Sequence, residues 1–155
     1  MTYYSSVPAA IAGLVTAFRT STGLGAAGVP VRDGPELTAA AGLEAVAAGY
    51  SGDQNTSVVT GTASPEGLAG LPDRERYAVT CCAEVIDKNG DITAARTRAY
   101  ALHAACGAAI AADHTLGGAV LRASIGIGSL QQTQTQAGAL ARVVFPVNID
   151  AFTSR

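Results

Sequence analysis

The sequence is poor in charge, and above all in lysine. Lys88 is the only lysine among 155 residues, charged residues make up 14% of the chain, and the net charge is −2 with a pI near 5.6. Proteins that bind nucleic acid or anionic membranes by charge gather an excess of Lys and Arg on one surface. The composition therefore argues against a protein whose main activity is charge-driven DNA binding.

Cysteines are few, and long apolar runs are missing. Cys81, Cys82 and Cys106 are an odd number without the spacing of a disulfide framework. Adjacent side chains of a strand point to opposite faces, so no bridge is expected between Cys81 and Cys82. No apolar run reaches the roughly 18 to 20 residues that span a bilayer, and the N-terminus lacks the pattern of a signal peptide. We expect a reduced protein, made and kept in the cytosol.

The longest periodic segment, residues 91–117, predicts a helix. Asp91 suits the N-cap, the run that follows is rich in Ala, and Gly117 and Gly118 offer a left-handed end. Apolar residues recur along it at spacings of three and four, which gives one narrow stripe. The stripe consists of Ile92, Ala95, Ala99, Leu102, Cys106 and Ala109. Such a stripe needs a sheet to lie on.

The other segments predict one more helix and several strands. Ser5 and Ser6 followed by Pro8 are typical of a helix start, and this helix is expected to run to about Arg19. Residues 37–50 are compatible with a helix or a strand, and we favour a strand; residues 51–72 are expected to form a long exposed loop. Strand patterns also occupy residues 29–33, 74–87, 119–130 and 139–149, with a polar turn at 133–138. Together they predict a single α+β domain over residues 1–155, with a mainly antiparallel sheet of about four strands and two helices packed on one face.

Gly23, Gly25 and Gly28 spell the G-x-G-x-x-G pattern of dinucleotide-binding proteins. That pattern works where a strand precedes the glycines and a helix follows them, so that helix amides meet the pyrophosphate. Here the predicted helix precedes the glycines and Pro30 follows them closely. A flexible linker is favoured, and no nucleotide cofactor is expected.

Asp87, Asn89 and Asp91 have the spacing of the first three ligands of a calcium loop. That loop also requires a glycine at its sixth position and a glutamate at its twelfth, where this chain has Ile92 and Arg98. A turn between a strand and the long helix is therefore favoured over a metal site, and no metal is expected.

Cys106 and His103 lie on one side of the predicted long helix, three positions apart. A catalytic cysteine requires an oriented base and an oxyanion pocket, and no third group that could orient His103 is visible. Because Cys106 belongs to the apolar stripe, packing in the core is favoured. A small cytosolic enzyme that uses this pair stays as an alternative.

The order of these elements resembles small tail-terminator proteins of actinobacterial long-tailed phages. The resemblance covers nearly the full chain and is most specific in D-I-x-A-A-R at residues 91–96 and Q-x-G-A-x-A-R-V-x-F at residues 136–145. It implies a structural virion protein without catalytic residues or cofactors, made in the bacterial host cytoplasm and located at the tail–neck junction. Such proteins form a hexameric ring that caps the tail tube, contacts the head–neck connector and lets DNA pass without specific binding. The alternatives within the virion are another head-to-tail connector and a tail-tube subunit.

A ring of this kind implies contact surfaces, and four regions are candidates. They are the loop 51–72, the polar tract at the hairpin tip, the aromatic pair of the N-terminal arm and the arginines of the long helix. The arginines could equally pair with Asp91 or Glu84 or face solvent, and loops and termini are commonly mobile. The candidate contact residues are Tyr3, Tyr4, Arg96, Arg98, Gln132 and Gln134.

Overall fold

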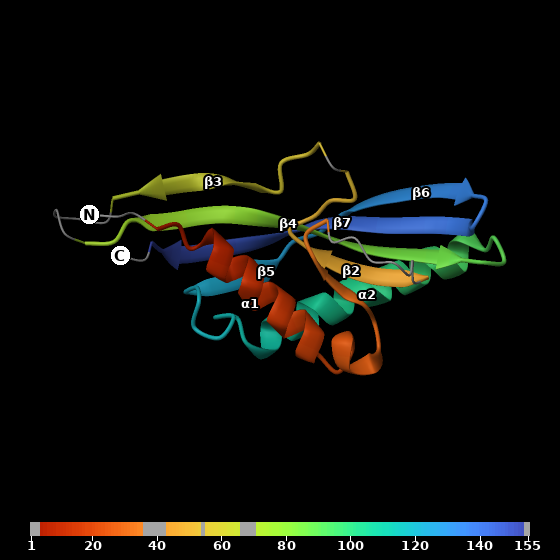
Figure 1. Ribbon diagram of the computed structural model, residues 1–155, viewed down its shortest axis with the longest axis horizontal. Coiled ribbons are helices and arrows are strands. Elements are labelled where there is room, and N and C mark those ends of the chain that lie inside the picture. The colour runs from red at the N-terminus through yellow and green to blue at the C-terminus, as the bar shows by residue number, and fades with distance from the viewer. Residues whose placement is uncertain (1–3, 36–42, 54, 66–70, 154–155) are drawn as a thin grey trace.

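The computed structural model describes residues 4–35, 43–53, 55–65 and 71–153 (Figure 1). Its helices are α1 (Val7–Thr20) and α2 (Ile92–Ala112), with one short 3-10 turn, η1 (Gly25–Ala27). Its strands are β1 (Val31–Asp33), β2 (Glu44–Ala48), β3 (Val59–Ser64), β4 (Arg74–Asp87), β5 (Arg122–Ile125), β6 (Ser129–Thr135) and β7 (Gly138–Phe152). Among the described residues, neither α-helix is long and apolar enough to cross a membrane.

Two long antiparallel strands, β4 and β7, form the centre of the sheet. They pair without a break from Arg74 opposite Phe152 to Asp87 opposite Ala139. The outer edge of β4 carries β3 along one half and β2 along the other, and the outer edge of β7 carries β5 and β6 in the same way. β1 adds to β2 in the only parallel pairing of the described strands.

The described residues form one sheet of seven strands of mixed direction, so the prediction of about four mainly antiparallel strands is wrong, although the fold is still α+β. The expected loop 51–72 contains β3, and the expected strand 119–130 contains β5 and only the first two residues of β6. The polar tract expected at the hairpin tip lies largely in β6, and the turn itself consists of Gln136 and Ala137. Because β3 and β6 are exposed on both sides along most of their length, they carry no alternation of apolar and polar residues.

Other predictions are confirmed. Residues 74–87 form β4 with the bounds expected, and β1 and β2 are the strands expected within 29–33 and 37–50, although residues 36–42 lie outside the described part. Asp91 caps α2, and its side chain accepts a hydrogen bond from the backbone N–H of Ala94 at 3.1 Å.

The expected end of the long helix at residue 117 is wrong. α2 stops at Ala112, because the Asp113 carboxylate accepts backbone hydrogen bonds from Thr115 and Gly117 at 3.0 and 2.7 Å. These bonds fold the next residues into a separate turn.

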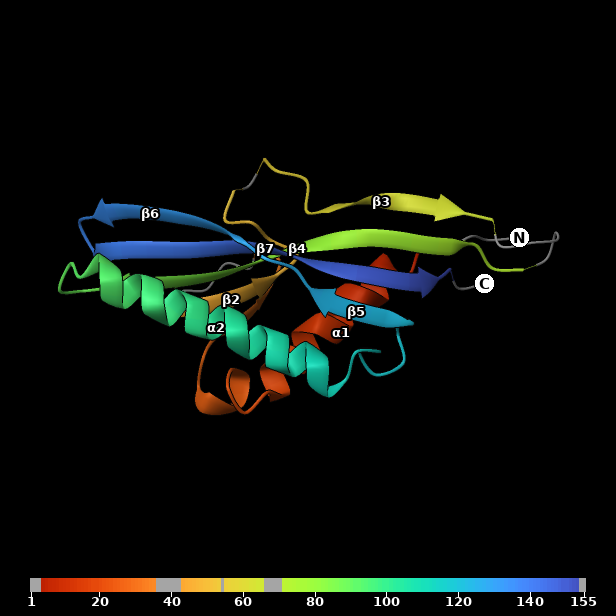
Figure 2. The same cartoon turned by 180° about the vertical axis from the view of Figure 1, so that it is seen from behind.

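Both helices pack on the same face of the sheet. The stripe of α2 that faces it is Ala95, Ala99, Leu102, Cys106 and Ile110, and α1 contributes Ala10, Leu14, Val15 and Phe18. They meet the alternate residues of β4 and β7 that include Val79, Cys81, Val143 and Phe145. The sheet is strongly twisted, so α1 lies in front of it in Figure 1 and α2 lies in front of it in the reverse view of Figure 2. The opposite face carries no helix of the described chain.

Candidate interaction surfaces

The arginines of the long helix hold it to the sheet. Arg98 donates two hydrogen bonds from its guanidinium to the carboxylate of Glu44 on β2, at 2.7 and 2.9 Å. The hydrogen bond from Arg98 lowers the pKa of the Glu44 carboxyl, against the opposing effect of burial. Both side chains are partly exposed, 45% for Arg98 and 30% for Glu44, so the pair contributes under about 1 kcal/mol.

The start of α2 and the residue Gly90 before it are tied to β6 by side chains. Arg96 donates to Oε1 of Gln132 at 2.9 Å, and Nε2 of Gln134 donates to the backbone oxygen of Gly90 at 3.1 Å. Four residues proposed from the sequence as subunit contacts therefore have partners within their own chain. Their part in contacts between subunits stays a prediction.

The N-terminal arm is anchored immediately after its aromatic pair. Tyr3 lies outside the described residues, and Tyr4 is 54% exposed. The next two residues bind one buried carboxylate: the Ser5 hydroxyl and the Ser6 backbone N–H each donate to Glu75 at 2.7 Å. Tyr4 is thus presented outward from a fixed segment.

Cys106 and His103 do not form a catalytic arrangement in the described chain. Nε2 of His103 lies 3.1 Å from the backbone oxygen of Gly126, and the imidazole packs edge-on against Phe145 with ring centroids 4.7 Å apart. Cys106 is fully buried in the core, as its place in the stripe predicts. Burial raises the pKa of the Cys106 thiol, which favours the protonated form over the nucleophilic thiolate.

The other two cysteines are also protonated at neutral pH. Burial raises the pKa of Cys81 to about 12 and that of Cys82 to about 11. Within the described residues, no group of three His, Cys, Asp or Glu side chains could hold a metal ion. These thiols therefore act as small apolar groups in the packing.

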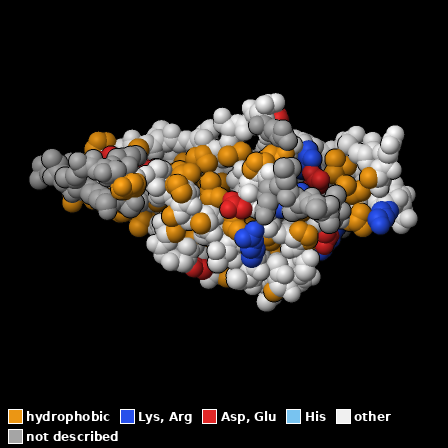
Figure 3. Space-filling view, viewed as in Figure 1, with side chains coloured by type: hydrophobic (Ala, Val, Ile, Leu, Met, Phe, Trp, Pro, Cys, Tyr) orange, Lys and Arg blue, Asp and Glu red, His pale blue; other side chains and the backbone are white. Residues whose placement is uncertain are grey.

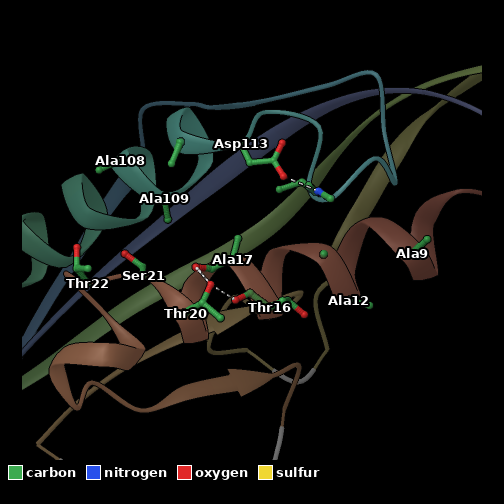
Figure 4. Close-up of a pocket in the computed structure, with 14 residues that line it drawn as sticks. Ala9, Ala12, Thr16, Ala17, Thr20, Ser21, Thr22, Ala108, Ala109 and Asp113 are labelled. Carbon is green, nitrogen blue, oxygen red and sulfur yellow. Dashed lines mark hydrogen bonds between the residues drawn. The ribbon is translucent and has the colours of Figure 1, made fainter.

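A groove of about 700 Å³ separates α1 from the last turns of α2 (Figure 4). Its walls are mainly Ala, Gly and Thr, because small side chains face each other where the two helices lie close. The Thr20 hydroxyl already donates a hydrogen bond to the Thr16 backbone oxygen at 2.9 Å. The Asp113 carboxylate already accepts hydrogen bonds from the backbone of the turn that follows it. The groove therefore offers an apolar lining with few free polar groups.

The open face of the sheet carries ion pairs that join β4 to β7. Arg74 binds Asp150 through two hydrogen bonds at 2.8 and 2.7 Å, and Arg142 binds Glu84 from the neighbouring strand at 2.8 Å. The hydrogen bond from Arg74 lowers the pKa of the Asp150 carboxyl. On the side shown in Figure 3, Lys and Arg side chains appear as separate small groups and form no broad field.

The apolar side chain of Ile127 projects from the sheet edge, and it was not predicted from the sequence. Ile127 is 91% exposed, between Gly126 and Gly128, where the chain passes from β5 to β6. A Cβ atom at either glycine would lie 2.7 Å from an atom of β7, so both residues must be glycine for the segment to follow the strand. The G-I-G pattern between two strands is the signal that could have located it.

Comparison with protein-family models and with curated proteins finds no match to this chain. The resemblance to tail terminators therefore rests on the patterns at residues 91–96 and 136–145 and on the order of the elements.

Proposed function

We propose that this protein is a structural component of a phage virion, a tail terminator. Copies of the chain form a ring, a hexamer as the resemblance implies, which caps the tail tube and joins it to the head–neck connector. The protein is made in the host cytoplasm and acts at the tail–neck junction, without a cofactor and without enzymatic activity.

The observation that carries the proposal is that the two segments of the resemblance belong to one part of the fold, because both supply residues to the core and both are joined to β6. Arg96, from the first segment, donates to Gln132, whose strand β6 is paired with the second segment at the start of β7. Gly138 approaches the end of β4 so closely that a Cβ atom would collide with the backbone oxygen of Asp87. Segments about 40 positions apart in the sequence thus belong to one structural unit.

Charge also supports the proposal. DNA passes through a terminator ring, and a basic lining would retain its phosphates by counterion release. The net charge of the chain is −2, and Arg74 and Arg142 are each paired with a carboxylate across β4 and β7. Such a surface suits a channel through which DNA slides.

The first test is the mass and the negative-stain image of the purified protein. Discrete six-membered rings are expected, and a chain that stays monomeric at all concentrations contradicts the proposal. Tubes of indefinite length point instead to a tail-tube subunit.

The second test is deletion of the gene from the phage that encodes it. Tails of abnormal length and heads without attached tails are expected, because nothing stops the tube or joins it to the neck. Normal tails on normal heads rule out a terminator.

A further inference from the structure

In the part of the chain that the structure describes, four strands form the outer edges of the sheet, and they fall into two kinds. β1 and β5 are short and charged: β1 has three residues, including Arg32 and Asp33, and β5 has four and begins with Arg122. β3 has six residues and β6 has seven, none of them charged and none of them proline, and most are exposed. Soluble proteins usually protect long edges with charge, proline or bulges, because an exposed uncharged edge pairs readily with another strand.

The direction of the backbone groups in β3 follows from one hydrogen bond. The Thr80 N–H donates to the Val58 oxygen at 2.8 Å, immediately before β3 begins. Hydrogen-bonded and non-bonded pairs alternate along an antiparallel ladder, and the register places Thr62 in a bonded position. Gly61 and Ala63 therefore direct their N–H and C=O groups away from β4, toward the free edge.

The same reasoning applies to β6. A two-residue turn joins Thr135 to Gly138, and the residues that flank such a turn form a bonded pair. Alternation then turns Thr133 toward β7 and leaves the N–H and C=O groups of Gln132 and Gln134 facing outward. The side chains of these two glutamines bind Arg96 and the Gly90 oxygen, on the helix side of the sheet. The backbone of the free edge is therefore left uncovered by them.

The two uncharged edges lie along the same long side of the molecule, at opposite ends (Figure 1 and Figure 2). Between them, described residues of the segment that links β2 to β3 rise above both strands in each view. A single neighbouring copy lying across both edges would meet this segment. Each edge is therefore placed to take a different neighbour.

We infer that β3 of one copy pairs with β6 of the next copy, so that the sheet continues from subunit to subunit. The two strands match in length and in their lack of charge, and they are different surfaces at opposite ends, as a heterologous contact requires. A chain of such contacts closes into a ring when the rotation between copies allows it. The inference rests on the proposed function and identifies the surfaces that would build the ring.

Proline at an outward-facing position tests each edge separately. Ala63→Pro and Gln134→Pro each remove one outward N–H donor without removing a hydrogen bond to β4 or β7. Ala63→Val and Gln134→Val are the matched controls, because they change the side chain and keep the N–H. By sedimentation equilibrium, we expect each proline variant to raise the dissociation constant of assembly about tenfold or more, and each valine variant to leave it near that of the unmodified chain.

Mixing the two proline variants distinguishes this pairing from the alternatives. Alone, each variant has only one intact edge and, at a concentration between the dissociation constant of the unmodified chain and its own raised value, is expected to be mainly a monomer of 15.5 kDa. A copy with an intact β6 and a copy with an intact β3 form one junction, so the mixture is expected to give a dimer of twice that mass. A dimer formed by either variant alone would show that like edges pair, and would overturn the inference.

The outcomes separate this inference from the proposed function. If the unmodified chain forms rings and both proline variants form them equally well, the edge pairing is wrong while the ring stands. If the unmodified chain forms only a dimer that the proline variants break, the edges pair but the terminator proposal fails.

Hydrogen exchange on the unmodified chain gives a reading that needs no substitution. The amides of Ala63 and Gln134 are expected to exchange slowly in the assembled protein and rapidly below the dissociation concentration. Rapid exchange of both amides in the assembled protein overturns the inference.

Discussion

The two faces of the sheet are made from alternate residues of the same two strands, yet they are held in different ways. On the helix-covered face, Val79, Cys81 and Phe145 are at most 1% exposed and pack against α2. On the open face, the corresponding positions include Glu84 and Arg142, which pair with each other across the strands and stay partly in water. Stability is therefore expected to reside in the covered face, while the ion pairs of the open face help to fix which strands pair.

The largest expected effect is on the covered face. Leu102→Ala should lower the free energy of unfolding by about 2 to 5 kcal/mol, because the fully buried side chain leaves a cavity between α2 and the sheet. Urea denaturation measures it. Thr97→Ala, at an exposed position of the same helix, is the control and should change stability by at most about 0.5 kcal/mol. Equal effects at the two positions would contradict the packing of α2.

A smaller effect is expected where a polar group is buried. Glu75 is 6% exposed and accepts from Ser5 and Ser6, so Glu75→Ala should cost about 1 to 3 kcal/mol by leaving the Ser6 N–H without its acceptor. Glu75→Gln retains an acceptor oxygen and should cost less. Chemical denaturation of both variants measures the difference, and identical losses would show that the hydrogen bonds of the arm contribute little.

On the open face, the pair of Glu84 and Arg142 should contribute under about 1 kcal/mol, because 32% and 22% of their side chains are in contact with water. A double-mutant cycle with Glu84→Gln and Arg142→Gln measures the coupling between them. A coupling as large as the Leu102→Ala effect would mean that the two faces are equally important for stability.

The smallest expected effect depends on pH. Arg98 lowers the pKa of Glu44, so the stabilisation from this pair is present above the usual pKa of glutamate and is lost as the pH falls through the lowered value. The difference in unfolding free energy between the unmodified chain and Glu44→Gln should be under about 1 kcal/mol near neutral pH and should shrink as the pH falls below the usual pKa of glutamate. A difference that grows on acidification would contradict the contact.

The elements that bury one side against the core were predicted from the sequence. β4 and the start of α2 have the expected bounds, because alternation and the apolar stripe are imposed by the covered face. β3 was expected to be part of a loop, and β6 spans the end of the expected strand 119–130 and the start of the expected turn 133–138, since strands buried on neither side are specified by their long neighbours and not by their own pattern. The partner of Arg98 was not predicted either, because Glu44 lies 54 positions away in the sequence.

The unbroken pairing of β4 with β7 has a consequence for how the chain folds. Paired residues are separated by 78 positions at one end of the ladder and by 52 at the other, with all of α2 between them. The chain loses conformational entropy when such long segments are closed, and this cost comes before the strand pairing stabilises the fold. Pairing of β4 with β7 is therefore slow, whereas α2 forms locally and early. During synthesis β4 therefore cannot pair with β7 until β7 has emerged. Until then, only α1, α2 and β2 can cover the apolar side of β4.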